Sequence, residues 1–256
     1  MPKRELTEAE KKHTKIAFRL AVFFACLILI DFLLITIFFS WRDWVAIFVF
    51  SLLFIFPGYI SNAAMVIVGG GKPIDGGRNF RDGRRILGDN KTWSGFIKGP
   101  LYLGIPISIG LFCLLLVLWP NIVNVPMTGI KNNHYKIYND IVYYQYYFIG
   151  GSFPFGFLSI IIRIVLCSYG AALGDLVGSF LKRRFDVESG APFWVIDQLD
   201  FAVFAILFVS IPAFIFPNLF WVPDIYMIIL LLILTPSVSI IANTVAYIGG
   251  LKDVPW

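Results

Sequence analysis

Three aspartates have the types and spacing to handle a metal-bound phosphate. Asp175 lies in the segment GDLVGSFLKRR (174–184), and Asp197 and Asp200 lie in the segment DQLD (197–200). In a helix, Asp175 would share one face with Ser179 and Lys182, and Asp197 would share one with Asp200. Carboxylate oxygens suit Mg²⁺, which takes one or two carboxylates together with waters and substrate phosphates. The pattern favours catalytic and metal-binding roles for all three aspartates.

Each of these groups also has a purely structural interpretation. Asp197 and Asp200 precede an apolar run and could cap a helix, whose N-terminus favours acidic side chains. Asp175 lies near a predicted membrane boundary, where a carboxylate is costly unless it is paired, so it could form a structural ion pair. The basic run 182–184 could anchor a helix at the membrane surface. Convergence of the three segments on one face would favour the chemical interpretation.

A glycine-rich and mostly basic loop, Gly69–Gly99, lies between two apolar runs. Arginine forks and bare glycine backbone both suit phosphate oxygens. Within the loop, the segment GDNKTW contains four residues that could clamp a phosphate, although it is not a Walker A motif. A surface turn that begins a helix is the alternative. The candidate phosphate-binding residues of this segment are Asp89, Asn90, Lys91 and Thr92.

The composition shows which elements must position these groups. The chain has 256 residues, of which 58% are hydrophobic and 14% charged, whereas soluble domains are about 45–50% apolar and about 25% charged. We therefore expect an all-α integral membrane protein with one membrane domain and about six transmembrane helices. The predicted spans cover residues 16–40, 45–68, 101–119, 153–180, 201–221 and 225–248, and residues 120–152 are predicted to form a tyrosine-rich loop on the membrane surface.

The distribution of basic residues predicts the orientation of these spans. With six spans, sixteen lysines and arginines fall on the side of both termini and the two polar loops, against three on the other side. The positive-inside rule places the termini and both active-site loops in the cytoplasm of a multi-pass cell-membrane protein. The net charge of +5 is explained by this asymmetry, and we expect no nucleic-acid partner.

Two of the charged residues inside the predicted spans lie well away from both span ends. Asp31 lies in the first span and Arg163 in the fourth, at similar predicted depth. Because charges inside a membrane usually pair, we expect an ion pair between them; the alternative is that each faces a water-filled cavity.

The motifs together resemble one known family. The segments GKPIDGGRNFRDGRRILGDNKTWSGF (71–96), GDLVGSFLKRR and DQLDF are similar to those of the CDP-archaeol synthases, which belong to the CDP-diacylglycerol synthase superfamily of membrane cytidylyltransferases. The resemblance implies a transfer of CMP from CTP to an unsaturated archaetidic acid, 2,3-bis-O-geranylgeranylglyceryl phosphate. The products would be CDP-archaeol and pyrophosphate, and the reaction would require Mg²⁺.

The resemblance also implies roles for individual residues. It makes Asp175, Asp197 and Asp200 the catalytic and metal-binding carboxylates. It implies that Lys91, Lys182 and Arg183 bind the CTP phosphates. It also implies that the loop or the substrate entrance is shaped by Asp75, Arg81, Arg84 and Arg85.

The chain departs from the family pattern in its additional N-terminal span, in a larger tyrosine-rich outer loop and at Ser94. We expect a single cytidylyltransferase domain over residues 1–256, in which residues 1–44 form an N-terminal tail plus an additional span and residues 45–256 form the family-like core. Ser94 stands where an arginine is expected. The expected partners are CTP, an isoprenoid ether-lipid phosphate and membrane lipids, and a homodimer is an open alternative.

Other functions share some of these features. A CDP-diacylglycerol synthase or a lipid kinase of the same superfamily could use the same groups. A lipid or phosphate transporter would explain the charges inside the spans, but it would need polar access from both sides of the membrane.

Overall fold

The computed structural model describes residues 7–152, 154–187 and 193–249. This part of the chain contains nine α-helices and one π-helical segment, and β-bridges occur there only as isolated pairs. The elements are α1 (Glu8–Phe38), α2 (Trp41–Ile67), α3 (Trp93–Lys98), η1 (Gly99–Gly104), α4 (Ile105–Ile122), α5 (Asn124–Lys131), α6 (Ile141–Ile149), α7 (Phe155–Arg184), α8 (Ile196–Ile215) and α9 (Ile225–Ile248).

Six helical stretches are long and apolar enough to cross a membrane, which confirms the predicted all-α architecture with about six spans. The third stretch is longer than predicted, because α3, η1 and α4 follow one another without a break from Trp93 to Ile122. Thr92 begins it: its Oγ accepts the N–H of Gly95 at 3.1 Å. The fifth stretch begins at Ile196, so Asp197 and Asp200 lie in the first turns of α8.

The prediction of a surface loop over residues 120–152 is wrong. Much of this segment is helical, in α5 and α6. Tyr144, Tyr146 and Tyr147 of α6 are buried and belong to the main hydrophobic core. A tyrosine ring is an apolar body with one polar tip, so a tyrosine-rich run fits a core as well as an interface. Asp43 is fully buried at the start of α2. Its carboxylate accepts the backbone N–H groups of residues 136–138 and so holds the turn that precedes α6.

The prediction that Asp31 pairs with Arg163 is also wrong, since the ion pairs among the described residues do not include it. Asp31 of α1 accepts a hydrogen bond from the indole of Trp44 at 2.8 Å. Arg163 of α7 donates to the carbonyl of Tyr146 at 3.1 Å and lies over the Tyr146 ring, 4.3 Å from its centre. Each charge is therefore stabilised by a polar or aromatic neighbour on an adjacent helix.

Helix α7 is the central element, and a glycine stripe brings α8 against it. Gly170, Gly174 and Gly178 recur every fourth residue on the face that meets α8. A Cβ at position 170 would lie 2.9 Å from the carbonyl oxygen of Phe204, and a Cβ at 174 would overlap the backbone of Asp200. Small residues at such spacing let membrane helices approach backbone to backbone. The stripe therefore sets the distance between the two helices that contain the three aspartates.

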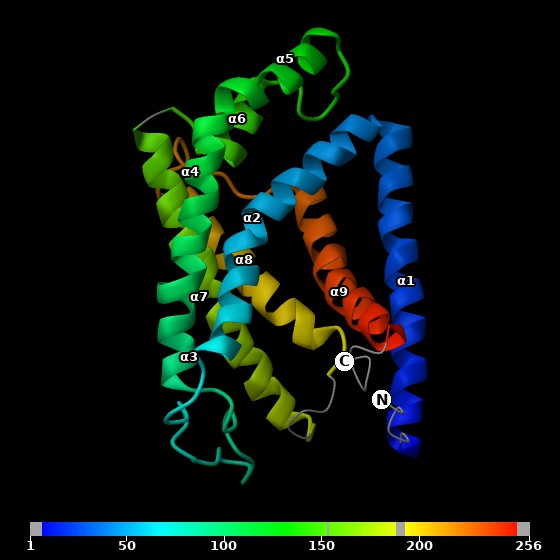
Figure 1. Cartoon of the computed structure of the whole chain (residues 1–256), viewed down its shortest axis with the longest axis vertical. Helices are drawn as coiled ribbons and strands as arrows, with labels where there is room; N and C mark the ends of the chain where they lie inside the picture. Colours follow the sequence, from blue (N-terminus) through cyan, green and yellow to red (C-terminus); the bar gives the residue numbers. More distant parts are fainter. Residues whose placement is uncertain (1–6, 153, 188–192, 250–256) are drawn as a thin grey trace.

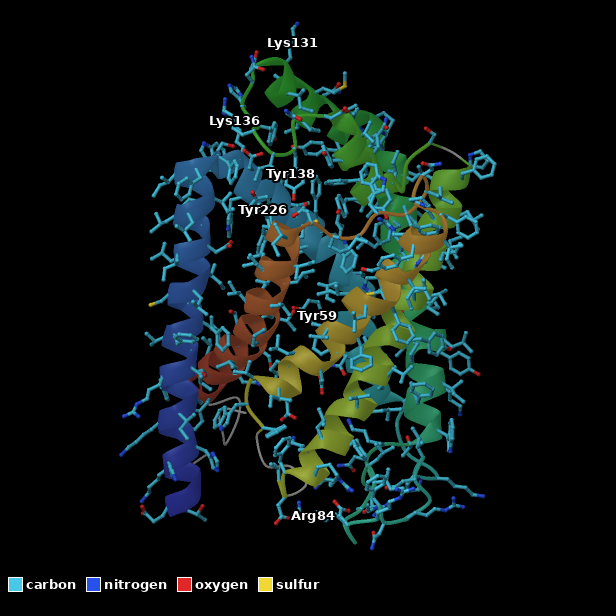
Figure 2. All side chains as sticks on the ribbon, turned by 180° about the vertical axis from the view of Figure 1, so that it is seen from behind. Tyr59, Arg84, Lys131, Lys136, Tyr138 and Tyr226 are labelled. Atoms are coloured by element: carbon cyan, nitrogen blue, oxygen red, sulfur yellow. The ribbon has the colours of Figure 1, made fainter. Side chains whose placement is uncertain are left out.

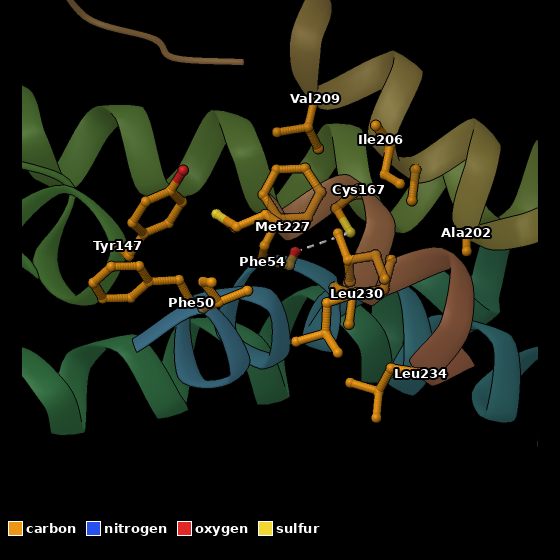
Figure 3. Packing of buried hydrophobic residues seen from close by; sticks show 14 of the residues in the cluster. Phe50, Phe54, Tyr147, Cys167, Ala202, Ile206, Val209, Met227, Leu230 and Leu234 are labelled. Atoms are coloured by element: carbon orange, nitrogen blue, oxygen red, sulfur yellow. Dashed lines mark hydrogen bonds between the residues drawn. The ribbon is translucent and has the colours of Figure 1, made fainter. Parts of the chain in front are cut away.

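Helices α2, α6, α7, α8 and α9 share one hydrophobic core (Figure 3). Helix α2 continues through Pro57 and changes direction along its length (Figure 1). At the core, the thiol of Cys167 contacts the carbonyl oxygen of Phe54 on α2 at 3.5 Å. Helix α1 lies at the side of this bundle, against α9 and α2.

The polar segments gather at one end of the molecule. In Figure 1 the glycine-rich loop lies at the lower end, together with the last turns of α7, whereas α5 and α6 lie at the upper end. Figure 2 shows Arg84 at the lower end and Lys131, Lys136 and Tyr138 at the upper end. The candidate site is at the lower end.

Candidate active site

A polar cavity of about 210 Å³ lies where the glycine-rich loop meets α7 and α8. The structure brings together here all three predicted catalytic aspartates and half of the predicted substrate-binding residues. The cavity is lined by Leu87, Gly88, Asn90, Lys91, Asp175, Ser179, Lys182, Arg183, Asp197 and Asp200.

Two lysine–carboxylate pairs stand in this cavity. The ammonium of Lys91 lies 2.6 Å from Asp175, and that of Lys182 lies 2.7 Å from Asp197. All four side chains are partly buried. Each pair offers one cation that could bind a phosphate oxygen and one carboxylate that could bind a cation. Such a set can receive a charged ligand without leaving a buried charge unpaired.

Asp200 is held differently. Its carboxylate accepts the backbone N–H of Phe201 at 2.6 Å and lies directly over Gly178 of α7, where a Cβ would overlap it. It lines the cavity and, within the described residues, takes part in no ion pair.

The metal-binding role of the aspartates stays a prediction. Among the described residues, no group of three histidine, cysteine or acidic side chains is arranged to hold a metal ion by itself. The donor chemistry nevertheless fits Mg²⁺ that arrives with a nucleotide, because such an ion needs only one or two protein carboxylates beside the phosphates. Asp175, Asp197 and Asp200 line one cavity and are the residues that could supply them.

The rest of the glycine-rich loop is folded around Asp75. Its side chain is fully buried and accepts hydrogen bonds from the Arg85 guanidinium and from the backbone N–H groups of Gly77, Leu87 and Gly88, at 3.0–3.2 Å. Burial alone would raise the pKa of Asp75, but these donors lower it well below its usual value. Asp75 and Arg85 therefore hold the loop in shape. This is the first of the two roles named for them above, shaping the loop or the substrate entrance.

Arginines at the end of α7 fasten this loop to the helix. Arg183 lines the cavity, but its guanidinium already donates hydrogen bonds to two backbone carbonyls. These are the carbonyls of Leu87 at 3.1 Å and Val187 at 2.8 Å. Arg184 donates to the carbonyls of Arg84 and Arg85 and pairs with Asp82 at 2.7 Å.

Arg184 also lies over two aromatic rings, those of Phe80 and Phe180. Sequence analysis missed this role and treated Arg184 as a membrane anchor. The arginine-rich end of α7 opposite a glycine loop was the available signal. Arg84 contacts the backbone of residue 184 and pairs with Asp186, so it too lies outside the cavity.

The predicted substrate-binding residues thus separate into three sets. Asn90, Lys91, Ser179, Lys182 and Arg183 line the polar cavity. Asp89, which is exposed and pairs with Arg85 at 2.6 Å, and Thr92, which caps α3, line a neighbouring cavity. Asp75, Arg84 and Arg85 bind the loop to itself and to α7.

A second cavity of about 500 Å³ adjoins the first and shares Asn90, Lys91 and Asp175 with it. Its wall combines the end of α2, the Gly69–Gly71 backbone and the start of the third span. Met65, Val66, Phe96 and Leu176 make part of this wall apolar. The Lys91–Asp175 pair therefore stands at the border between a polar cavity and a partly apolar one.

Comparisons with known proteins identify the family of the chain. Residues 44–125 and 135–256 match a family model described as "CarS-like: CDP-archaeol synthase". A CDP-archaeol synthase from Methanococcus aeolicus is 38% identical over 80% of this chain and 95% of its own length. One from Thermococcus kodakarensis is 38% identical over 83% of this chain and 99% of its own length.

A more distant likeness is to a solved structure described as "Structural insight into an intramembrane enzyme for archaeal membrane lipids biosynthesis". It has a TM-score of 0.43 and 23% identity, and the match covers 78% of this chain and 92% of that one. The family model and the curated relatives each cover most of the chain. The chain belongs to the CDP-archaeol synthase family.

Proposed function

We propose that the chain makes CDP-archaeol from CTP and 2,3-bis-O-geranylgeranylglyceryl phosphate in the two adjoining cavities, with the site on the cytoplasmic face. The enzyme class, a CTP-dependent nucleotidyltransferase of archaeal phospholipid biosynthesis, follows from the family. One observation supports the location above all: the border of the two cavities is a lysine–carboxylate pair, Lys91 with Asp175.

The polar cavity suits the nucleotide. Lys91 and Lys182 each present an ammonium group that a triphosphate could take over from its present carboxylate partner. The hydroxyl of Ser179 and the amide of Asn90 line the same cavity and can hydrogen-bond phosphate or sugar oxygens. The positive-inside count supports a cytoplasmic site, where CTP is available.

The partly apolar cavity suits the lipid phosphate. Its apolar wall lies at the ends of α2 and of the third span, both of which are membrane-spanning by length and composition. A lipid whose chains remain in the membrane could place its headgroup phosphate beside Lys91. The two substrates would then meet at the Lys91–Asp175 border.

The reaction needs few steps at this border. An oxygen of the lipid phosphate attacks the α-phosphorus of CTP, the new P–O bond forms, and the bond to the bridging oxygen of the β-phosphate breaks, releasing pyrophosphate. A phosphate monoester has a second pKa of about 6, so the attacking oxygen is largely ionised near neutral pH and needs no strong general base. Lys91 and Lys182 would neutralise charge on the reacting phosphates.

Mg²⁺, when bound with CTP by the aspartates, would stabilise charge on the attacking and leaving oxygens. Asp197 lies in the first turn of α8 and pairs with Lys182 in the wall of the polar cavity. We therefore expect Asp197→Asn to lower kcat by at least about 100-fold, the usual effect of removing one preorganised electrostatic group.

The test is pyrophosphate release by purified full-length protein with Mg²⁺ and CTP, in the presence of either the isoprenoid lipid phosphate or phosphatidic acid. Asp186→Asn is the matched control, because Asp186 is 79% exposed and lines neither cavity. Release that requires the isoprenoid lipid supports the proposal, and release with phosphatidic acid alone moves the substrate to an acyl lipid. Turnover by Asp197→Asn at the rate of Asp186→Asn would overturn the site assignment.

A further inference from the structure

Helix α1 extends beyond the residues that the family model matches and reaches the connection between α7 and α8. The matched region begins at residue 44, so all of α1 precedes it. Most of α1 packs on α9 and α2. Near its N-terminal end, however, the ring of His13 lies 5.7 Å from the ring of Trp194, with the planes at 39°. Trp194 stands two residues before the first residue of α8.

The backbone at Trp194 has an unusual conformation. Its φ is +40°, in the left-handed region that a bulky side chain rarely adopts. Such a conformation persists only when surrounding contacts hold it. The contact with His13 is one such restraint, and it comes from a helix distant in sequence.

The residue before Trp194 touches a predicted catalytic carboxylate. The backbone N–H of Phe193 donates to Asp197 Oδ2 at 2.9 Å, and the Lys182 ammonium binds the same oxygen at 2.7 Å. The ring of Phe193 also packs against Phe185, just past the end of α7, with centres 5.7 Å apart. The orientation of the Asp197 carboxylate thus depends on the backbone at 193–194.

We propose that His13 is a positioning residue for the reaction: its ring holds Trp194 in the left-handed conformation, and the Phe193 amide thereby keeps the Asp197 carboxylate turned toward Lys182 and the polar cavity. The additional N-terminal helix is then part of the active-site support and not only a further span. This inference rests on the role proposed above for Asp197. The effect would pass from the His13 ring to the Trp194 ring, and from the adjoining Phe193 amide to the Asp197 carboxylate.

The alternative is that α1 only stabilises the bundle, and a matched variant separates the two. Phe18, one and a half turns further along α1, has its ring 6.4 Å from that of Tyr247 on α9. Phe18→Ala removes an aromatic contact of the same helix with the bundle and leaves residues 193–197 untouched. His13→Ala removes the contact with Trp194, and His13→Phe restores a ring at that position.

The experiment combines steady-state kinetics in CTP with hydrogen exchange of the peptide that covers residues 193–199, on full-length protein. We expect His13→Ala to lower kcat/KM for CTP by about three- to tenfold, the range that an aromatic contact supports, and to speed exchange in this peptide. His13→Phe should recover most of both, and Phe18→Ala should change neither. Trp194→Ala combined with His13→Ala should cost no more than Trp194→Ala alone, since contacting residues are not additive.

The outcomes distinguish this inference from the proposed function. If His13→Ala behaves as wild type in both measurements, or if Phe18→Ala matches its effects, the positioning role is refuted while an inactive Asp197→Asn still supports the proposed site. If Asp197→Asn retains full turnover, the proposed site and the inference that rests on it both fall.

Discussion

The buried carboxylate of Asp75 allows a quantitative prediction about the glycine-rich loop. Its Oδ1 accepts the N–H of Gly77 and one Arg85 donor, and its Oδ2 accepts another Arg85 donor and the N–H groups of Leu87 and Gly88. In Asp75→Asn one of these oxygens becomes an NH₂ donor, so at least two donors lose their acceptor in either amide orientation. Each buried donor left without a partner costs about 1–3 kcal/mol.

Two such donors would together cost about 2–6 kcal/mol. Arg85 is 28% exposed and can turn toward water, so we expect a cost of about 2–4 kcal/mol, in the lower part of this summed range. We expect this cost to appear as easier opening of the loop and not of the whole bundle, because the five hydrogen bonds that the Asp75 carboxylate accepts all come from loop residues. The opening constant should rise by roughly 30- to 1,000-fold. Catalysis should fall with it, since Leu87, Gly88 and Lys91 of the same loop line the polar cavity.

Hydrogen exchange of the peptides covering residues 77–88 measures this opening directly, with pyrophosphate release measured in parallel. Asp82→Asn is the control, because Asp82 is 39% exposed and its pair with Arg184 is worth about 1 kcal/mol or less. Exchange in Asp75→Asn no faster than in Asp82→Asn would refute the hydrogen-bond accounting.

The lowered pKa of Asp75 gives the same loop a predictable pH dependence. A carboxylate whose folded pKa lies below its unfolded value contributes stability that is fully present above the unfolded value of about 3.9. That contribution is lost as the pH falls from there toward the folded pKa. Loop protection in the wild-type protein should therefore be flat from neutral pH down to about 5 and fall below about 4, whereas Asp75→Asn should lack this fall.

Two further predictions concern glycine packing and the far end of the molecule. Gly178→Ala would place a Cβ on the Asp200 carboxylate and should abolish most activity, while Gly110→Ala, at a position with open space around its Cβ, should leave pyrophosphate release within about twofold of wild type. Asp43→Asn leaves backbone N–H groups of residues 136–138, of which that of Tyr138 is buried, short of an acceptor and should cost about 2 kcal/mol or more of stability. Thermal unfolding in detergent should show this loss, with kcat unchanged and Asp140→Asn, at an exposed cap, as the milder control; a fall in kcat with an unchanged midpoint would contradict it.

The membrane architecture was predictable because it depends on long apolar runs, which are local properties of the sequence. The convergence of Asp175, Asp197 and Asp200 was predictable because a short connection makes α7 and α8 neighbours. The stripe of Gly170, Gly174 and Gly178 was not among the predictions, and it explains why the aspartates lie so close to the opposite helix.

What could not be predicted depends on partners distant in sequence. The sequence indicated a membrane anchor for Arg184 and a role for Asp75 in the loop or the substrate entrance, but only the fold shows Asp75 buried and Arg184 bound to loop carbonyls. Similar depth in the membrane did not make Asp31 and Arg163 neighbours, because the two helices lie on different sides of α2 and each charge found a nearer aromatic partner. The burial of Tyr144 likewise follows from tertiary packing and not from local polarity.

The contact between α2 and η1 has a consequence for how the chain can vary. A Cβ at Gly104 would overlap the side chain of Ser61, and a Cβ at Gly99 would lie 2.9 Å from the backbone of Met65. The segments on either side of the glycine-rich loop are therefore held in a fixed register by this close packing. The two ends of the loop cannot shift relative to each other. Insertions and deletions should be tolerated at its exposed tip around Gly83, while a single inserted residue between 61 and 65 or between 99 and 104 would displace Lys91 from Asp175.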